Sequence, residues 1–234
     1  MRVLRGRAET RASDRQVTAE MLETAGERRE PALRVWTPNR QIVFGRRESN
    51  EPGYEAAREA ARERGFTPLE RSVGGRAVAY TGSTLAFALA LPIEDPRTGM
   101  NERYERASDR VQRALREVGA PVERGEPPDS FCPGRHSLSC RGKLVGIAQR
   151  VRSDSALVSG IVVVDGHEEI AAVLEPVYAA LDSPFDPGSV GSVERAGGEA
   201  DSHTVAREIE SWLIGDREVR IERVDQVDRV DRKP

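Results

Sequence analysis

The chain has 234 residues with a formal net charge of −3, and 32% of its residues are charged. This length suits one large domain whose core needs no disulfide or metal to stabilise it, and the mixed charge excludes a nucleic-acid binder built on a basic surface. Two cysteines are too few for a disulfide framework. No apolar segment follows the basic N-terminus, and the longest apolar run, residues 85–91, is too short to cross a membrane. We therefore expect a cytoplasmic protein that does not contact membranes.

Apolar periodicity predicts helices and strands in alternating groups along the chain. Helical spacing of apolar residues occurs in residues 14–25, 54–64, 101–118, 168–181 and 204–213. Short apolar runs bounded by turn residues predict strands at residues 33–36, 41–44, 66–70, 84–91, 143–151, 157–164 and 218–224. Because the strands come in neighbouring pairs with helices between the pairs, we expect an α+β fold with a mixed, mostly antiparallel central sheet flanked by helices. Residues 1–216 are predicted to form a single domain, and residues 217–234 a terminal strand and a charged tail.

A glycine-rich segment between two predicted strands is the first candidate site. It contains Gly74 and Gly75, and adjacent glycines let the backbone approach a ligand with its N–H groups turned towards it. The following strand alternates small and large residues at Ala86, Phe87 and Ala88, which leaves space for a narrow apolar channel. An acyl chain buried there would gain about 0.8 kcal/mol for each CH₂. On spacing alone, a hairpin turn that requires glycine is the favoured alternative.

The second candidate site lies in residues 131–150, which include both cysteines. Cys132, His136 and Cys140 are spaced as metal ligands on one helical face would be, but the Pro-Gly pair after Cys132 excludes that helix. We therefore expect no metal site. An inert thiol and a cysteine nucleophile are the other interpretations. The loop position of Cys132 favours an accessible thiol, whereas Cys140, just before a predicted strand, suits the inert role.

Lysine is rare in this chain: of 36 basic residues, only Lys143 and Lys233 are lysines. Compositional bias explains the scarcity, but it draws attention to Lys143, because lysine can release a proton and arginine cannot. A free thiol is mostly protonated at neutral pH. Lys143 is the only lysine within the predicted domain that can promote the thiolate of a nearby cysteine.

Together the two segments resemble the biotin/lipoate protein ligase superfamily, which includes the lipoyl and octanoyl transferases. Within it, the chain is most similar to the cysteine-dependent octanoyl or lipoyl amidotransferases. Residues 71–78 resemble their glycine loop, and residues 132–134 with 142–150 resemble their nucleophile loop and lysine strand. With shorter likenesses in two predicted strands, the resemblance covers about residues 30–215.

The resemblance implies a role for each matched residue. Cys132 would be the nucleophile that accepts the acyl group, and Lys143 would lie against the thioester carbonyl and assist proton transfer. Backbone N–H groups of the Cys132 loop, or of the strand before it, would stabilise the oxyanion. The residues lining the acyl pocket would be Arg71, Gly74, Gly75 and Ala77 on one side and Gly146 and Ala148 on the other.

Two departures distinguish the chain from the ATP-dependent lipoate ligases of the same superfamily. Those ligases usually have a third glycine where this chain has Arg76, and a His-Gly pair where it has Ser159 and Gly160. Both departures weigh against an acyl-adenylate and favour transfer through Cys132. No cofactor is therefore expected, and ATP with Mg²⁺ would be needed only if the chain were a ligase.

The function implied is transfer of an octanoyl or lipoyl group to a lysine of a lipoyl carrier domain through a thioester at Cys132. An acylated carrier protein would be the donor, and the acceptor would be the glycine cleavage H protein or the acyltransferase subunit of a 2-oxoacid dehydrogenase. An ATP-dependent lipoate–protein ligase is the main alternative, and a biotin ligase is more distant. A non-catalytic protein that binds lipoyl domains is the alternative from another class, and in it Cys132 would be dispensable.

Overall fold

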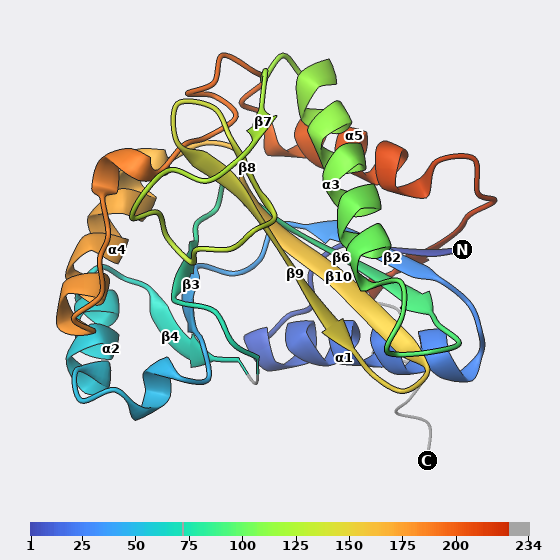
Figure 1. The fold of residues 1–234 in the computed structure, drawn as a ribbon, viewed down its shortest axis with the longest axis horizontal. Helices are drawn as coiled ribbons and strands as arrows, with labels where there is room; N and C mark the ends of the chain where they lie inside the picture. The colour runs from blue at the N-terminus through green and yellow to red at the C-terminus, as the bar shows by residue number, and fades with distance from the viewer. Residues whose placement is uncertain (72, 225–234) are drawn as a thin grey trace.

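The structure is a computed structural model that describes residues 1–71 and 73–224 (Figure 1). The helices are α1 (Arg11–Glu27), α2 (Tyr54–Glu63), α3 (Met100–Glu117), α4 (His167–Ala180) and α5 (Ser202–Ile214), with short 3-10 helices η1 (Glu48–Asn50) and η2 (Pro187–Ser189). The strands are β1 (Arg2–Arg5), β2 (Ala32–Trp36), β3 (Gln41–Phe44), β4 (Thr67–Glu70), β5 (Val78–Tyr80), β6 (Thr84–Pro92), β7 (Glu123–Arg124), β8 (Ser137–Ser139), β9 (Lys143–Val151), β10 (Ser155–Val163) and β11 (Arg220–Arg223). Every predicted helix and strand is present, with ends that differ by a few residues. Within these described residues, no helix is both long enough and apolar enough to span a membrane.

Most strands form one mixed sheet in the order β11-β1-β2-β6-β10-β9-β8-β7. β1 is parallel to both β11 and β2, and the remaining neighbours in this sheet are antiparallel. A smaller sheet has the order β4-β3-β5, with β3 parallel to β4 and antiparallel to β5. The predicted mixed, mostly antiparallel sheet with flanking helices is therefore confirmed.

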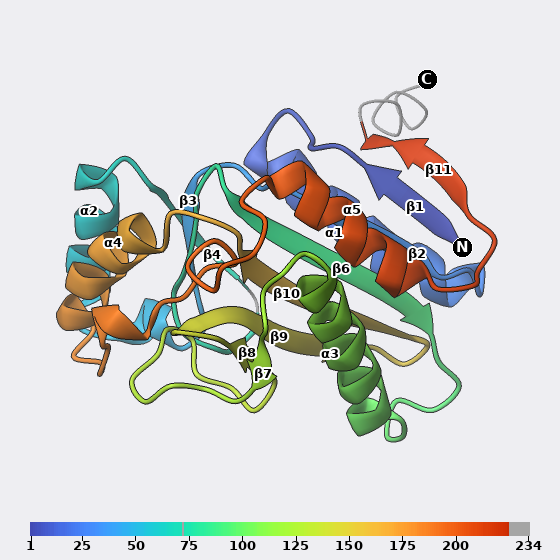
Figure 2. The same ribbon diagram turned by 90° about the horizontal axis from the view of Figure 1, so that it is seen from above.

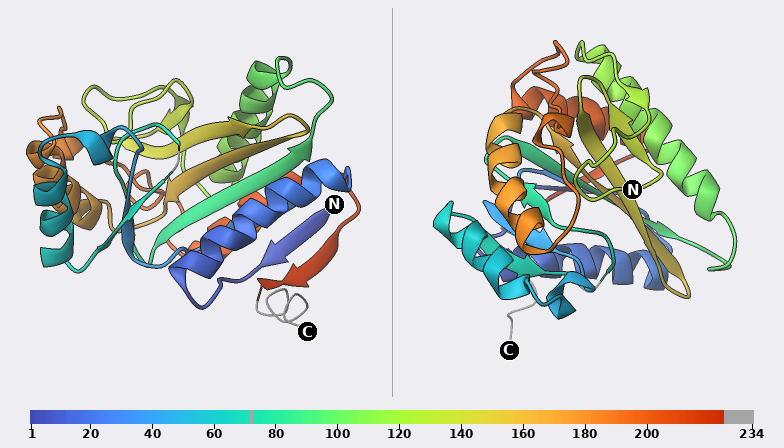
Figure 3. Two further views of the ribbon diagram at one scale, coloured as in Figure 1. Left: turned by 90° about the horizontal axis from the view of Figure 1, so that it is seen from below. Right: turned by 60° about the vertical axis from the view of Figure 1, so that its left-hand side comes forward.

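Helices cover both faces of the large sheet, because successive residues of a strand point to opposite faces. Figure 2 shows α5 in front of α1, and the opposite view in Figure 3 shows α1 in front of the sheet. On the α1 side, Val17 and Met21 pack against Ala88 and Ala90 of β6. On the other side, the larger residues of β6 pack with α3 and α5, among them Leu85, Phe87, Leu89, Val111, Leu115, Val205 and Ile209. Ala88 is completely buried among the apolar residues of α1, so its small size accommodates the helix. The apolar channel expected beside this strand is therefore not formed at Ala88.

The small sheet packs with α2 and α4 at one end of the molecule (Figure 1). The glycine-rich segment connects β4 to β5, and β5 is followed directly by β6 of the large sheet. The fold therefore places this segment close to the junction of the two sheets.

The structure differs from the sequence-based prediction in its short strands and in how strands pair. β1, β5, β7 and β8, which have two to four residues each, were not predicted from the apolar pattern. β2 and β3 were expected as neighbours but belong to different sheets, and the same is true of β4 and β6. β11, the predicted terminal strand, pairs with β1. The charged tail at 225–234 lies outside the described residues.

Candidate active site

Cys132 lies in the loop that joins β7 to β8, and its backbone has a left-handed conformation with φ 41°. Residues other than glycine rarely adopt this conformation, and they keep it only where the surroundings impose it. The preceding residue, Phe131, is buried in the main core, whereas Cys132 is half-buried and has a free thiol. The loop therefore presents this thiol at the edge of the core, in a backbone conformation that its neighbours must maintain.

Lys143 begins β9, is completely buried, and holds the Cys132 loop through its ammonium group. Its Nζ donates to the carbonyl oxygens of Phe131 at 2.9 Å and Cys132 at 2.8 Å, and to Oε1 of Glu126 at 2.5 Å. An ammonium has three N–H donors, so these bonds use all of them. We expected Lys143 to promote the thiolate, but its ammonium contacts the main-chain carbonyl of Cys132 and a carboxylate.

Glu126 is the acceptor that ties the Cys132 loop together. Besides Lys143, its carboxylate accepts hydrogen bonds from Ser130 Oγ at 2.9 Å, the Gly134 N–H at 2.7 Å and Ser137 Oγ at 3.3 Å. Burial raises the pKa of the Glu126 carboxyl, but the hydrogen bonds from Lys143 and Gly134 outweigh burial, so that the pKa lies below its ordinary value. Glu126 therefore remains ionised and links both ends of the loop to β9.

The glycine loop between β4 and β5 contacts the Cys132 thiol. A Cβ added at Gly75, whose φ is 94°, would lie 3.1 Å from Cys132 Sγ and 2.5 Å from Nη2 of Arg71. That Nη2 donates a hydrogen bond to Cys132 Sγ at 3.5 Å. Glycine at position 75 is therefore required both by the backbone conformation and by the close approach of guanidinium and thiol.

Glu48, a buried residue of η1, anchors the end of the glycine loop. Its carboxylate accepts hydrogen bonds from the N–H of Ala77 at 3.0 Å and of Gly45 at 2.8 Å. Burial raises the pKa of Glu48, although both N–H donors and the nearby Arg71 lower it. A Cβ at Gly45 would lie 1.7 Å from the carbonyl oxygen of Gly75, so glycine at position 45 lets the glycine loop lie directly against β3.

Tyr178 of α4 connects the two loops. Its Oη accepts a hydrogen bond from the Cys132 N–H at 2.7 Å and donates one to the Ala77 carbonyl oxygen at 3.0 Å. The side chain is buried, and burial raises the pKa of its hydroxyl, which keeps the hydroxyl protonated as a donor. Because the N–H groups of Cys132 and Gly134 are occupied by Tyr178 and Glu126, they are not the free oxyanion donors that we expected from this loop.

The β9 residues expected to line the acyl pocket occupy different surroundings. A Cβ at Gly146 would lie 3.5 Å from Cε of Lys143, so Gly146 adjoins the lysine side chain. Ala148 is exposed and lies two residues further along the strand, about 7 Å away. On the neighbouring β10, a Cβ at Gly160 would lie 2.5 Å from the ring of Phe87, so this glycine is required by packing.

The structure therefore brings Cys132, Arg71 and Gly75 together and places Lys143 on the main-chain side of the same loop. Gly74 is exposed, and an added Cβ there would meet no atom within 4 Å. The roles assigned to these residues by resemblance stay predictions. Three polar residues that hold the site were not predicted from the sequence, namely Glu48, Glu126 and Tyr178. Their partners are distant in sequence, and only the tyrosine, in an apolar helix, had a recognisable signal, because a buried tyrosine hydroxyl needs a partner.

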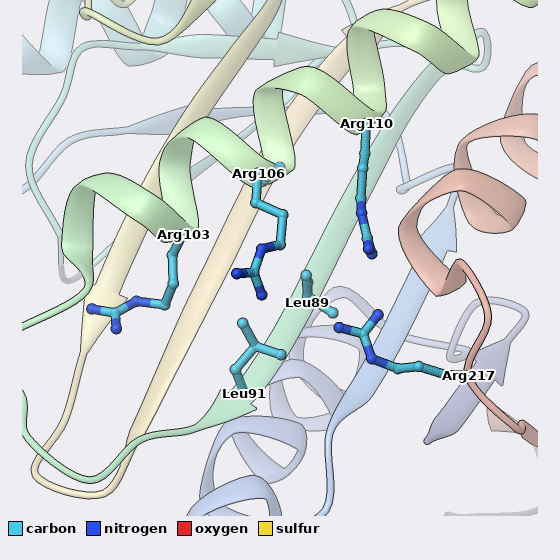
Figure 4. A pocket seen from close by; sticks show the side chains of 7 residues that line it. Leu89, Leu91, Arg103, Arg106, Arg110 and Arg217 are labelled. Atoms are coloured by element: carbon cyan, nitrogen blue, oxygen red, sulfur yellow. The ribbon is translucent and has the colours of Figure 1, made fainter.

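A separate hollow of about 20 Å³ lies on the α3 side of the sheet (Figure 4). Arg103, Arg106 and Arg110 of α3 lie near Arg217 there, over leucines of β6. None of the predicted acyl-binding residues lines this hollow. In the described part of the chain, no group of three or more His, Cys, Asp or Glu side chains is arranged to hold a metal ion.

The mixed sheet flanked by helices has the fold of the lipoate-protein ligases. The chain matches the lipoyl protein ligase A/B catalytic domain family over residues 12–195. It therefore belongs to this family.

Two curated relatives illustrate the similarity at the level of sequence. An octanoyl-[GcvH]:protein N-octanoyltransferase of Lysinibacillus sphaericus is 27% identical over 150 residues, which are 63% of this chain and 54% of the relative. A lipoyl-[GcvH]:protein N-lipoyltransferase of Listeria monocytogenes is 25% identical over 150 residues, with the same coverage of 63% and 54%. The chain thus spans about half the length of the curated relatives it matches.

Solved structures show the same fold at lower sequence identity. The crystal structure of a lipoate-protein ligase A bound with ATP superposes with a TM-score of 0.72 at 17% identity, covering 99% of this chain and 94% of that chain. At this identity the similarity is evidence for the fold alone.

Proposed function

We propose that the chain is an acyltransferase that moves an octanoyl or lipoyl group from an acylated carrier protein to a lysine of a lipoyl domain, through a thioester at Cys132. The observation that supports this most directly is the contact of the Cys132 thiol with the glycine loop and with the guanidinium of Arg71. A thiol needs such a cationic, partly exposed environment to act as a nucleophile. The names of the curated relatives describe transferases of the same two acyl groups.

The reaction balances in two steps. In the first, the Cys132 sulfur bonds to the acyl carbon, the bond from that carbon to the donor carrier breaks, and the thiol proton ends on the leaving group. In the second, the amine of the acceptor lysine bonds to the acyl carbon, the carbon–sulfur bond breaks, and an amine proton returns to the thiol. No net proton or electron is gained or lost, so the cycle needs no redox partner.

The partners follow from the same proposal. The relatives' names include GcvH, the glycine cleavage H protein, as the carrier written with the acyl group. We take an octanoylated or lipoylated H protein as the donor to be tested, and an unmodified lipoyl domain, of a 2-oxoacid dehydrogenase subunit or of another H protein, as the acceptor. No membrane or nucleic acid takes part.

Transfer is proposed to require neither ATP nor Mg²⁺. The acyl group arrives already bonded to a carrier, so it needs no activation as an adenylate. Arg76, which replaces the third glycine of the ligases, donates a hydrogen bond to Ser183 Oγ. Its side chain thus links the glycine loop to the segment after α4, at a position where the ligases have no side chain.

The test is a transfer assay with purified components. Octanoylated H protein and an unmodified lipoyl domain are incubated with the chain in the absence of ATP, and the mass of the lipoyl domain is followed. The expected result is an octanoylated lipoyl domain with the wild-type chain and none with Cys132→Ser. Efficient attachment of free octanoate or lipoate that needs ATP and persists in Cys132→Ser would establish the ligase alternative instead.

A further inference from the structure

The guanidinium of Arg71 is the cationic group that contacts the sulfur of Cys132. Its Nη2 donates to Sγ at 3.5 Å, and a hydrogen bond from a charged donor favours the ionised form of its acceptor. We infer that Arg71 is a catalytic residue that stabilises the Cys132 thiolate, a role that the resemblance to amidotransferases did not assign to it. This inference rests on the proposed function, in which Cys132 is the nucleophile.

The position of Arg71 is set by the glycine loop itself. Its Nε donates to the Gly74 carbonyl oxygen at 3.1 Å, and its Nη2 donates to the Arg76 carbonyl oxygen at 2.8 Å. The missing side chain of Gly75 leaves the space through which the guanidinium reaches the thiol. These hydrogen bonds hold a cation beside the sulfur, which is a second use of the paired glycines besides any contact with the acyl chain.

Lys143 does not occupy this position in the described structure. Its three N–H donors bind the carbonyl oxygens of Phe131 and Cys132 and the carboxylate of Glu126. The Glu126 carboxylate, 2.5 Å away, also balances the charge of the ammonium. The site thus has two ion pairs in the proposed reactive state: Lys143 pairs with Glu126, and Arg71 pairs with the thiolate of Cys132. Because a guanidinium stays charged at every physiological pH, the second pair forms whenever the thiol ionises.

Other titratable groups also face the thiol. Tyr80 of β5 and Tyr178 of α4 are both near enough for the charge of Cys132 to influence them, and burial raises the pKa of each tyrosine, which keeps both neutral. The charges of Arg71 and Arg76 both act on Glu48 of η1. Among the described groups named here, Arg71 is the cation that donates a hydrogen bond to the sulfur.

The thiol of Cys132 loses its proton to solvent, and the resulting thiolate attacks the acyl carbon. As the carbon–sulfur bond forms, the negative charge moves from sulfur to the carbonyl oxygen, until the bond to the carrier breaks and the leaving group takes a proton from solvent. Arg71 stabilises the charge before this step and donates no proton in it.

The test measures the reactivity of the thiol without any acyl donor, so its failure is distinct from failure of the proposed function. In a Cys140→Ser background, the rate of alkylation by iodoacetamide is measured from pH 6 to pH 10, because only the thiolate reacts. Arg71→Gln is expected to react about tenfold more slowly at neutral pH and to shift the rate profile to higher pH, as loss of an adjacent charge predicts. The control is Arg47→Gln, which removes the charge of an exposed arginine outside the glycine loop, and it should keep the wild-type profile.

A second variant separates charge from folding. Arg71→Lys keeps the cation but lacks the planar fork that binds the Gly74 and Arg76 carbonyl oxygens, and it should show a profile between those of wild type and Arg71→Gln. All variants are checked for wild-type circular dichroism before use. An unchanged rate profile in folded Arg71→Gln would overturn the inference that Arg71 stabilises the thiolate.

Discussion

Glu126 and Lys143 form the charged pair on which the geometry of Cys132 depends. Both oxygens of the Glu126 carboxylate are occupied, and all three donors of the ammonium are used. Loss of one member of such a pair leaves the other charged and poorly solvated, which destabilises a protein more than the pair itself stabilises it. Lys143 is therefore needed for the loop conformation as well as for any proton transfer that it assists.

We predict that Glu126→Gln destabilises the protein, and more so at neutral pH than at acidic pH. Because the folded-state pKa of Glu126 lies below its ordinary value of 4.5, the carboxylate contributes stability that is present above that pH and is lost as the pH falls through the folded-state pKa. We expect the substitution to lower the free energy of unfolding by about 1–3 kcal/mol at pH 7. The difference between wild type and variant should shrink steadily below pH 4.5, as measured by urea unfolding at each pH.

The control for this measurement is Glu117→Gln, because Glu117 is an exposed residue of α3. Surface substitutions of this kind change stability by no more than about 0.5 kcal/mol. If Glu126→Gln had an equally small effect, or an effect that did not depend on pH, the assignment of Glu126 as the anchor of the loop would be wrong.

At the scale of elements, α4 and β3 hold the two loops in register. Tyr178 of α4 binds both Cys132 and Ala77 through one hydroxyl, and Gly45, directly after β3, supports the backbone of Gly75. The thiol therefore depends on contacts from two elements of the small-sheet end of the molecule, while its lysine comes from β9 of the large sheet.

We predict that Tyr178→Phe keeps the fold but weakens the junction of the two loops. The ring still packs against Phe185, whose centroid is 4.9 Å away, but the Cys132 N–H and the Ala77 carbonyl each lose a partner. Unpaired buried groups of this kind destabilise by about 1–3 kcal/mol, which thermal or urea unfolding can measure. A free energy of unfolding equal to that of wild type would mean that the hydroxyl does not hold the loops.

We predict that Gly45→Ala displaces the glycine loop from the thiol. A methyl group at this position would clash with the carbonyl of Gly75, and relief of such overpacking requires backbone movement that costs about 1–3 kcal/mol. Gly82→Ala is the matched control, since a Cβ at Gly82 meets no atom within 4 Å. In transfer assays, Gly45→Ala should lose most activity and Gly82→Ala should retain it. Equal activities of the two variants would contradict the proposal that Gly45 positions the glycine loop.

At the scale of the whole molecule, the sequence allowed the elements to be located but not their arrangement. Periodicity identified α1 to α5 and the longer strands because burial of one face repeats along each of them. The pairing of β1 with β11, and the division of β2 and β3 between two sheets, depend on contacts between distant segments that no local pattern encodes.

The candidate site was predictable to a similar extent. The glycine loop and the Cys132 segment were both identified from sequence, and the structure brings them into contact. The residues that fix their geometry, Glu126 and Tyr178, act through single long-range hydrogen bonds and leave no motif. For the same reason, the contact of a guanidinium with the thiol was not predicted, although Arg71 itself was assigned to the site.

The central claim is that Cys132 carries the acyl group, and the most direct measurement is the intact mass of the chain after incubation with octanoylated H protein without ATP. We predict one octanoyl adduct, removable by hydroxylamine, in the wild-type chain and in Cys140→Ser, and none in Cys132→Ser. The adduct should disappear when an unmodified lipoyl domain is added, as the acyl group moves to its lysine. An adduct that persists in Cys132→Ser, or transfer to the lipoyl domain by that variant at the wild-type rate, would contradict the account.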